Sequence, residues 1–340
     1  MIDKTLATAA SPLARLRAMH PLVPWVLTGI VLVPLPWLAL NEYQIYMIDF
    51  TCVMILASVG LNIIKGFAGQ VTVGHIGLFA IGAYSSAILS LNFGFPFWLS
   101  LPCAVAITAM AGLIVGIPSF RLEGAYLALV TLGLSESVRL FIIVTPYLGG
   151  TIGIGNIPAP QIGDFAFDNW TRYYFLLMPI TLLGIYCSFR ILGSRVGRAF
   201  KALREDPIAA AAAGINVRRY KLLAFFISAI YAGTAGAMWA HMDPGYISPN
   251  SITLLEMVTM LLIVVLGGIG NIWGGIIGAI IVTIVHDLTA PYPWYQFVLY
   301  GGFIVITVLY MPKGIGGLIE RYFVTRRFIE ARKRRLNDDT

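Results

Sequence analysis

Charged residues are scarce in this sequence. Asp, Glu, Lys and Arg make up 11% of its 340 residues, whereas hydrophobic residues make up 58%. An average soluble domain carries about 25% charged residues, and a chain of this length cannot bury so much apolar surface in a core of its own. The composition therefore excludes an ordinary soluble protein and predicts an all-α, polytopic helix bundle in a membrane.

Motifs typical of enzymes are also absent. The chain has no GxxxxGK[ST] loop for nucleotide phosphates, no HExxH zinc motif and no GxSxG nucleophile motif. Its three cysteines and four histidines are scattered without metal-binding or redox spacing. We therefore expect no enzymatic activity, no metal and no cofactor. Any ATP that drives its function has to be hydrolysed by a separate subunit.

Long apolar stretches follow one another along the chain, and about 20 such residues span a bilayer as a helix. The stretch 66–94 is apolar too, but its many glycines, serines and threonines favour a broken or partly re-entrant helix. Counted as one crossing, it gives ten spans together with 22–40, 43–64, 95–120, 122–144, 173–192, 222–241, 251–267, 276–290 and 296–311.

Basic residues gather in the tail 1–20, the loop 193–221 and the tail 312–340. Ten alternating crossings place all three on one side of the membrane, and the acidic or neutral loops 145–172 and 242–250 on the other. Because cytoplasmic loops carry an excess of Lys and Arg, we expect cytoplasmic termini and an outer loop at 145–172. The basic tail is interpreted as a topological signal and not as a nucleic-acid site.

Small residues recur at helical spacing within the spans. Gly112 and Gly116 form a GxxxG pair, as do Gly274 and Gly278, and the stretch "AGTAGA" covers 232–237. Such residues let helix backbones approach closely in lipid. They predict a tightly packed bundle.

A charged, alanine-rich segment, "AFKALREDPIAAAAAGINVRRYK", occupies residues 199–221. Asp206 is a preferred helix N-cap and Pro207 suits the first helical position. Five alanines then favour a helix, and Gly214 supplies a left-handed residue at its end. Just upstream, an amphipathic helix at the inner interface is predicted by the spacing of Val196, Phe200 and Leu203.

Two interpretations of this short helix remain open. It is either a connecting helix that forms because alanine favours helices, or a docking element for another protein. The short alanine side chains would let a partner approach the backbone, and the flanking charges would orient it.

The segment resembles the cytoplasmic coupling loop of LivM-type permeases, which are membrane subunits of ABC importers for branched-chain amino acids. The resemblance extends over nearly the whole chain, through "GLNIIKGFAGQVTVGHIGLFAIGAY" (60–84), "RLEGAYLALVTLGLSESVRL" (121–140), "LGGIGNIWGGIIGA" (266–279) and "MPKGIGGL" (311–318). It implies that contact with the ATPase is made by Arg204, Glu205, Asp206, Pro207, Ala209, Ala210, Gly214 and Ile215.

The resemblance further implies one permease domain over residues 1–340 in a bacterial inner membrane. Its expected partners are a homologous second permease, two cytoplasmic ATP-binding subunits and a periplasmic or extracellular binding protein. The expected cargo is Leu, Ile or Val. Other neutral amino acids, urea and short amides are the nearest alternatives.

Polar side chains among the glycines of 62–84 are candidates for lining the transport path. Irregular backbone at membrane depth is tolerated where it lines water or is buried in protein. These side chains could equally hold neighbouring helices together. The candidates are Asn62, Gln70, Thr72, His75 and Tyr84.

The composition is also compatible with two other function classes. A proton- or ion-coupled secondary transporter needs ionisable groups near the bilayer centre, but those of this chain lie toward the outer ends of their spans: Asp49, Glu136, Arg139, Glu256, His286 and Asp287. Glu136 and Arg139 have the spacing of an intrahelical pair. His286 is more simply interpreted as a hydrogen-bonded anchor. An intramembrane enzyme would need a nucleophile with its base, and the sequence offers no such constellation.

Overall fold

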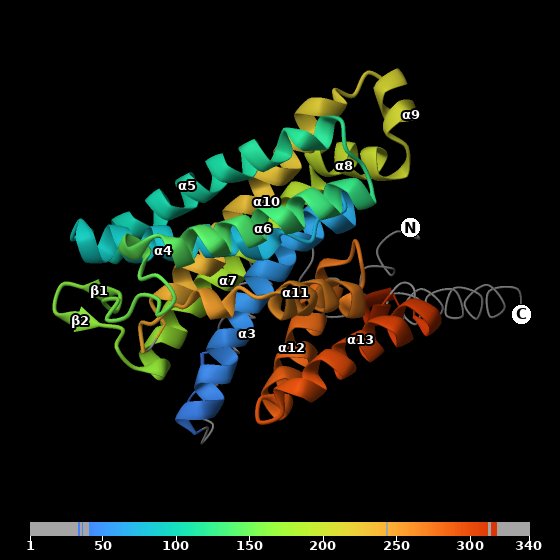
Figure 1. Cartoon of the computed structure of the whole chain (residues 1–340). Helices are drawn as coiled ribbons and strands as arrows, with labels where there is room; N and C mark the ends of the chain where they lie inside the picture. Colours follow the sequence, from blue (N-terminus) through green and yellow to red (C-terminus); the bar gives the residue numbers. More distant parts are fainter. Residues whose placement is uncertain (1–32, 35, 37–40, 243, 312–313, 318–340) are drawn as a thin grey trace, which may run out of the picture.

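The computed structural model describes residues 41–242, 244–311 and 314–317, together with Val33, Pro34 and Pro36. Within these residues the chain folds into an all-α bundle with nine helices that are long and apolar enough to cross a membrane (Figure 1). They correspond to nine of the ten predicted spans. The tenth, 22–40, lies almost wholly outside the described residues, as do the predicted tails 1–20 and, apart from 314–317, 312–340.

The long helices are α3 (Glu42–Leu61), α4 (His75–Asn92), α5 (Phe97–Gly116), α6 (Ala125–Val144), α7 (Trp170–Gly193), α10 (Val217–Ala240), α11 (Leu254–Gly267), α12 (Ile272–Thr289) and α13 (Pro293–Tyr310). Two short helices, α8 (Arg195–Glu205) and α9 (Pro207–Ala212), connect α7 to α10. The remaining elements are a π-helix over Asn62–Phe67, the 3₁₀ turns Pro118–Phe120, Pro146–Leu148 and Pro249–Ser251, and a hairpin of β1 (Gln161–Ile162) and β2 (Phe165–Ala166).

The predicted break near 66–94 is present. A π-helix over Asn62–Phe67 continues α3, and a loop over 68–74 then separates it from α4. A π-helix closes wider turns than an α-helix and occurs mostly in single turns at functional positions. Helix α4 itself has 18 residues and is long and apolar enough to cross a membrane on its own.

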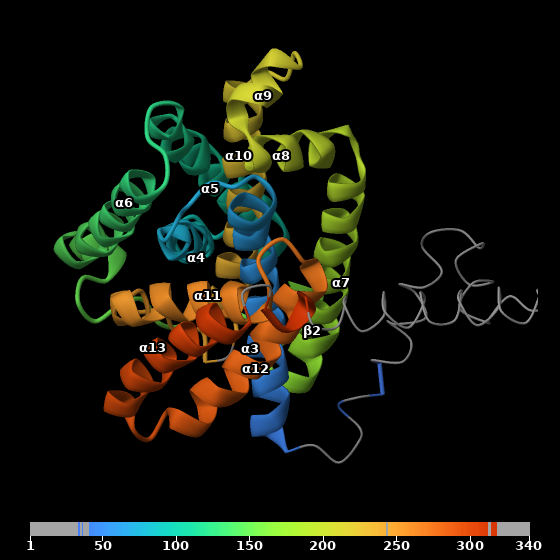
Figure 2. The same cartoon turned by 90° about the vertical axis from the view of Figure 1, so that its right-hand side faces the viewer.

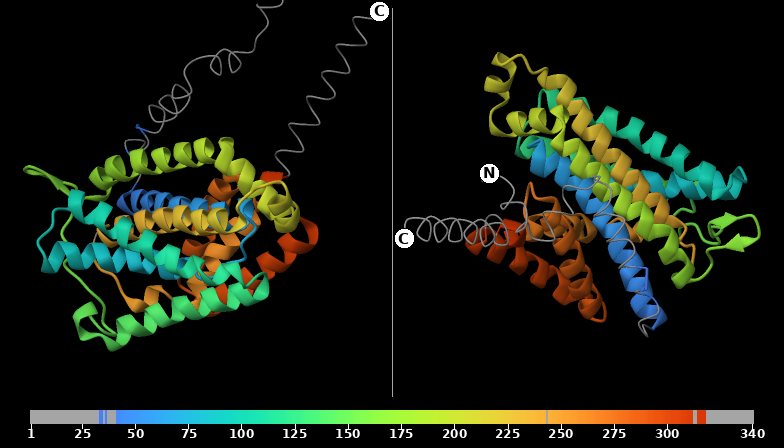
Figure 3. Two further views of the ribbon diagram at one scale, coloured as in Figure 1. Left: turned by 90° about the horizontal axis from the view of Figure 1, so that it is seen from above. Right: turned by 180° about the vertical axis from the view of Figure 1, so that it is seen from behind.

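Helix α10 lies in the middle of the bundle, where it contacts α3, α4 and α5 (Figure 2). Helix α7 packs against α3 and is also bonded to α10, because the Tyr173 hydroxyl donates to the Met238 carbonyl oxygen and the Tyr231 hydroxyl donates to the Gly184 carbonyl oxygen. Helices α3, α7 and α10 run side by side (Figure 3). Helices α11, α12 and α13 form a second group, which is joined to the first mainly through α3.

The small residues predicted to pack closely do so. A Cβ atom built on Gly236 of α10 would lie 2.0 Å from the Phe79 carbonyl oxygen of α4, and one on Gly82 would lie 2.6 Å from the Cα of Gly233. A Cβ on Gly278 of α12 would lie 2.1 Å from the Ile263 carbonyl oxygen of α11. In lipid, such backbone contact supplies the attraction that hydrophobic burial supplies in water.

The two ends of the bundle differ in charge. The end that carries α8 and α9, called the α9 end below, holds a group of basic residues: Lys65, Arg121, Arg190, Arg195, Arg198, Lys201, Arg204, Arg218, Arg219 and Lys221. The opposite end, called the hairpin end, carries β1 and β2 with Glu42, Asp164, Asp168, Arg172 and Asp287. This separation is the pattern on which the predicted topology depends.

A buried histidine ties the loops of the hairpin end to the helices. His241 Nδ1 lies 2.8 Å from the Pro158 carbonyl oxygen and Nε2 lies 2.9 Å from the Ser86 hydroxyl. Because a carbonyl only accepts, Nδ1 carries the proton and Nε2 accepts from Ser86. An antiparallel bridge between Ile154 and Ile247 likewise joins the loop between α6 and α7 to the loop between α10 and α11.

Replacement of Gly236 by alanine is expected to destabilise the bundle by about 1–3 kcal/mol, because the added methyl group overlaps the backbone of α4. Gly133→Ala is the matched control, since nothing lies within 4 Å of a Cβ at that helical position. Denaturant unfolding in mixed micelles measures both. Equal stability of the two variants would contradict the close packing.

Stability is expected to fall as the pH drops below about 6.5, the ordinary pKa of histidine. Burial lowers the pKa of His241 in the folded state, so the unfolded chain binds the proton more readily and acid favours unfolding. The loss amounts to at most about 1.4 kcal/mol per pH unit for one group. Melting curves between pH 8 and 5 should show a flatter pH dependence for His241→Gln. An unchanged slope would exclude His241 as the cause.

Candidate coupling site and transport path

Helix α8 is amphipathic, as the spacing predicts. Phe200 and Leu203 are fully buried and Val196 is half-buried against the core. Arg195 and Lys201, by contrast, are exposed on the other face. The Ser194 side chain accepts from the Val196 amide and begins the helix. Helix α8 therefore rests on the bundle and carries α9 beyond it (Figure 1).

Both ends of α9 are closed by residues of its own segment. The Asp206 carboxylate accepts from the amides of Ile208 at 2.8 Å and Ala209 at 3.1 Å. At the other end Gly214 has φ of 84°. Its amide donates to the Ala211 carbonyl, and that of Ile215 donates to the Ala210 carbonyl. This pair of bonds is a Schellman motif, and it confirms the boundaries predicted from Asp206, Pro207 and Gly214.

The outer surface of α9 is formed by alanines around one large apolar side chain. Ile208 is 83% exposed, and Ala209, Ala211 and Ala212 are exposed as well. Ala210 is only 4% exposed, so it faces the bundle. Of the two alanines predicted to contact the ATPase, Ala209 lies on the accessible face of α9 and Ala210 does not. Ile208 was missed, although an isolated isoleucine in a polar segment was a usable signal.

Arg204 and Glu205 end α8, and both are exposed. The Arg204 guanidinium nevertheless points toward the bundle, where Nη1 donates to the Gly66 carbonyl oxygen at 2.5 Å. A Cβ on Gly270 would lie 2.3 Å from the same nitrogen. Arg204 is therefore wedged between the π-helix and the turn that joins α11 to α12.

Asn62 joins the same two elements from within. Its Nδ2 donates to the Asn271 carbonyl oxygen at 2.8 Å, and its Oδ1 accepts from the Gly270 amide at 2.8 Å. Asn62 is 1% exposed, and both ends of its amide are used. We call the contact of Asn62, Gly66, Arg204 and Gly270 the glycine junction. It brings together the end of α8, the π-helix and the α11–α12 turn.

A second link runs from the start of α10 to the connection between α5 and α6. Lys221 is buried, and its Nζ donates to Glu123 Oε1 at 2.7 Å and to the Ser119 carbonyl oxygen at 3.2 Å. A buried ammonium requires such partners. The sequence alone places Lys221 among the basic residues of the loop 193–221 and does not indicate that it is buried or what it binds.

The five path candidates are all buried, but they do not form one group. His75 Nδ1 lies 3.2 Å from the Ser228 hydroxyl of α10, and Thr72 is 4% exposed in the loop before α4. Tyr84 lies nine residues beyond His75 on α4, about 13 Å along the helix. Among the described residues, no partner is found for Gln70 Oε1, His75 Nε2 or the Tyr84 hydroxyl. These three atoms are buried without a partner, whereas both polar atoms of the Asn62 amide are bonded.

Most of the ionisable groups within the spans have partners. Glu136 and Arg139 form the predicted pair at 2.5 Å. His286 Nδ1 lies 3.0 Å from the Tyr300 hydroxyl, and the Tyr43 hydroxyl donates to Asp287. Asp49 differs: it is fully buried, and neither carboxylate oxygen has a hydrogen-bond partner among the described residues.

Comparison with known proteins finds one matching family and several relatives. A family described as "Branched-chain amino acid transport system / permease component" matches residues 45–308. The chain is 36% identical to the high-affinity branched-chain amino acid transport system permease protein LivM of Escherichia coli K12, over 78% of this chain and 68% of that protein.

Two more distant relatives are also permease proteins. The permease protein LivH of E. coli K12 is 26% identical over 77% of this chain and 90% of its own length. The nucleoside ABC transporter permease protein NupC of Lactococcus lactis is 26% identical over 61% of this chain and 69% of its own.

Proposed function

This chain belongs to the family of branched-chain amino acid permease components, and we propose that it imports branched-chain or related neutral amino acids with energy from separate ATPase subunits. It is a multi-pass membrane protein and a permease subunit of an ABC transporter. The observation that carries the proposal is the self-capped, exposed helix α9 at the basic end of the bundle.

We place the α9 end in the cytoplasm, because the basic residues gather there. In this orientation the inner membrane of a bacterium holds one permease domain over residues 1–340. Its cytoplasmic parts are the N-tail 1–20, the coupling loop 193–221 and the basic tail 312–340. The loop 145–172 then faces outward, where a periplasmic or extracellular binding protein would deliver the cargo.

Helix α9 is the proposed contact with an ATPase subunit. Ile208 presents its side chain to solvent beside exposed alanines, which let a groove on the partner close around the helix. Burial of this exposed isoleucine against a partner would remove its apolar surface from water and so favour binding. Glu205, Asp206, Pro207, Ala209, Gly214 and Ile215 complete the proposed contact surface.

Replacement of Ile208 by glutamate is expected to reduce co-purification of the ATPase subunits at least tenfold, because it puts a charge into an apolar contact. Ile152→Glu is the control, since Ile152 is 77% exposed at the opposite end. Quantitative mass spectrometry of tagged complexes in mild detergent measures the ratio. If both variants retain the ATPases equally, α9 is a connecting helix only.

The glycine junction is the proposed route by which movement of α9 reaches the bundle. Arg204 stands three residues before the start of α9, and its side chain donates a hydrogen bond directly to the π-helix. The π-helix is in turn fixed to the α11–α12 turn by Asn62. A displacement of α9 would therefore act on α3, which the π-helix continues, and on the turn that joins α11 to α12. Through the bonds of Lys221 it would also act on the α5–α6 connection. Packed elements with two arrangements transmit such displacements.

Arg204→Gln is expected to separate ATP hydrolysis from transport. The ATPases should still bind, but uptake into proteoliposomes per ATP hydrolysed should fall about tenfold, because the glycine junction loses its charged donor. Lys201→Gln removes a nearby exposed charge of the same helix and should leave the ratio unchanged. The same loss in both variants would assign the effect to surface charge.

A homologous second permease is proposed to enclose the path together with this chain, with Gln70, Thr72, His75 and Tyr84 as candidate lining residues and Asn62 as the residue that holds the path's inner end. A nucleoside permease is among the relatives, so nucleosides are tested as cargo beside amino acids and urea. Competition of labelled leucine uptake by unlabelled isoleucine, urea and uridine distinguishes the alternatives. A gradient-driven secondary transporter would instead take up cargo without any ATPase.

A further inference from the structure

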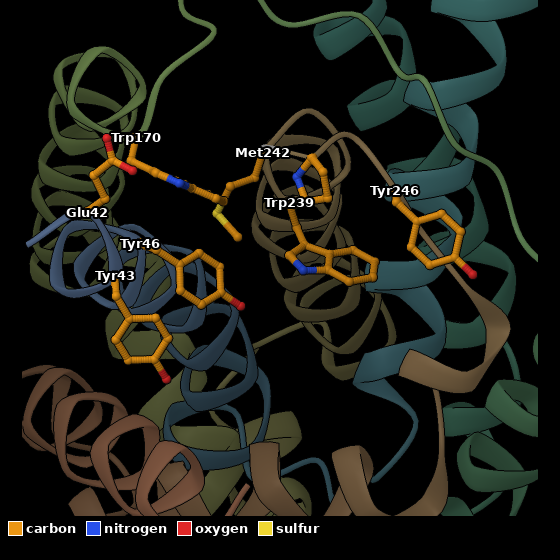
Figure 4. Close-up of a pocket in the computed structure, with 8 residues that line it drawn as sticks. Glu42, Tyr43, Tyr46, Trp170, Trp239, Met242 and Tyr246 are labelled. Carbon is orange, nitrogen blue, oxygen red and sulfur yellow. The ribbon is translucent and has the colours of Figure 1, made fainter. Parts of the chain in front are cut away.

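A cleft opens at the hairpin end between the start of α3, the start of α7 and the end of α10 (Figure 4). Its volume is about 480 Å³, enough for a small amino acid. The residues used below are Glu42, Tyr46, Trp170, Trp239, Met242 and Tyr246. We call this hollow the aromatic cleft.

The walls of the aromatic cleft are held by ring contacts. Tyr46 packs edge-on against Trp170 with ring centroids 4.8 Å apart, and Trp239 lies 5.5 Å from Phe79 of α4. Tyr46 and Trp239 face each other across the hollow (Figure 4). Aromatic faces attract cations and also pack against aliphatic chains. The cleft thus suits a ligand that has both features.

Charges of both signs lie at one side of this cleft. Glu42 and Trp170 also line a neighbouring polar hollow, which contains Asp168 and Arg172. Arg172 pairs with Asp168 at 2.8 Å, while no ion pair is found for Glu42 among the described residues. A free carboxylate and a guanidinium beside an aromatic wall match the ammonium and carboxylate of an amino acid head group.

Asp49 lies below the cleft on the same face of α3. Residues 42, 46 and 49 follow one another at i, i+4 and i+7, so Asp49 is about 10 Å deeper than Glu42 along the helix. It is fully buried and both of its oxygens lack partners in the described chain. A carboxylate in that position is costly unless a cation or a hydrogen-bond donor meets it, and intramembrane acids mark substrate or ion routes by default.

We propose that the aromatic cleft receives amino acids with a small aliphatic side chain, and that their ammonium group passes from Glu42 to Asp49 when the cleft deepens. In the first position the ammonium lies between Glu42 and the Tyr46 ring, the carboxylate faces Arg172, and the aliphatic chain contacts Trp239 and Met242. That the ligand is an amino acid rests on the proposed function. That the ligand carries a positive charge rests on Glu42, Asp49 and the aromatic walls of the cleft.

Binding is tested on the purified full chain by ligand-observed NMR titration with three probes of one carbon skeleton. They are L-leucine, 3-methylbutylamine, which lacks the carboxylate, and 4-methylpentanoate, which lacks the ammonium. Leucine and the amine should bind, and the acid should bind at least tenfold more weakly. Glu42→Gln should weaken both ammonium ligands about tenfold, while Glu136→Gln, which removes a carboxylate already paired on α6, should have no effect.

Either of two results would overturn the binding site: equal binding of acid and amine, or unchanged binding in Glu42→Gln. The titration needs neither ATP nor partner subunits. If the assembled wild-type transporter takes up no leucine, the proposed function is refuted but the binding site in the cleft is not. If the purified chain binds none of the probes, the binding site is refuted but the proposed function is not.

The role of Asp49 is tested by separating binding from turnover. Asp49→Asn should leave the dissociation constant of leucine at the cleft unchanged, which also shows that the variant is folded. It should lower the maximal rate of ATP-driven uptake at least tenfold, with partial recovery in Asp49→Glu. Unchanged uptake in Asp49→Asn would remove Asp49 from the route, and weakened binding would show that it shapes the cleft only.

Discussion

Close backbone contact along α10 is the constraint on which the bundle depends. Three helices, α3, α4 and α5, pack against α10, and the approach at Gly236 and between Gly82 and Gly233 leaves no room for a side chain. Lipid provides no hydrophobic drive between helices, so van der Waals contact at this distance has to hold the bundle together. The central position of α10 follows from its small residues, because a helix with large side chains on several faces could not admit three neighbours so closely.

Directional interactions occur within the bundle, as between His75 and Ser228, and also at its two ends. Those that join loops, turns and helix termini lie at the ends. At the α9 end they are the glycine junction and the Lys221 link. At the hairpin end they are the His241 bonds, the Ile154–Ile247 bridge and the hydrogen bond from Tyr43 to Asp287. Packed helices slide past one another by small shear movements between discrete arrangements. The polar contacts at the ends would then determine which arrangement is favoured.

How far the sequence predicted this structure depends on the range of each interaction. The spans and the caps of α9 were predictable, because composition and the bonds from Asp206 and Gly214 act within a few residues. The contacts Lys221–Glu123 and Tyr43–Asp287 join residues 98 and 244 positions apart, and no local pattern marks them. Ala210 shows the intermediate case: its helix was predicted, but the face it buries is set by how α8 packs on the bundle.

The two caps of α9 also bear on how the chain could acquire new partners. Every bond that begins or ends this helix comes from residues 206–215, so its shape does not depend on the rest of the protein. Ten consecutive residues therefore form an exchangeable cassette. If α9 is the ATPase contact proposed above, recombination at the borders of this segment would change which ATPase the permease binds and would leave the bundle unchanged. Importers could then change their ATPase subunits independently of their cargo.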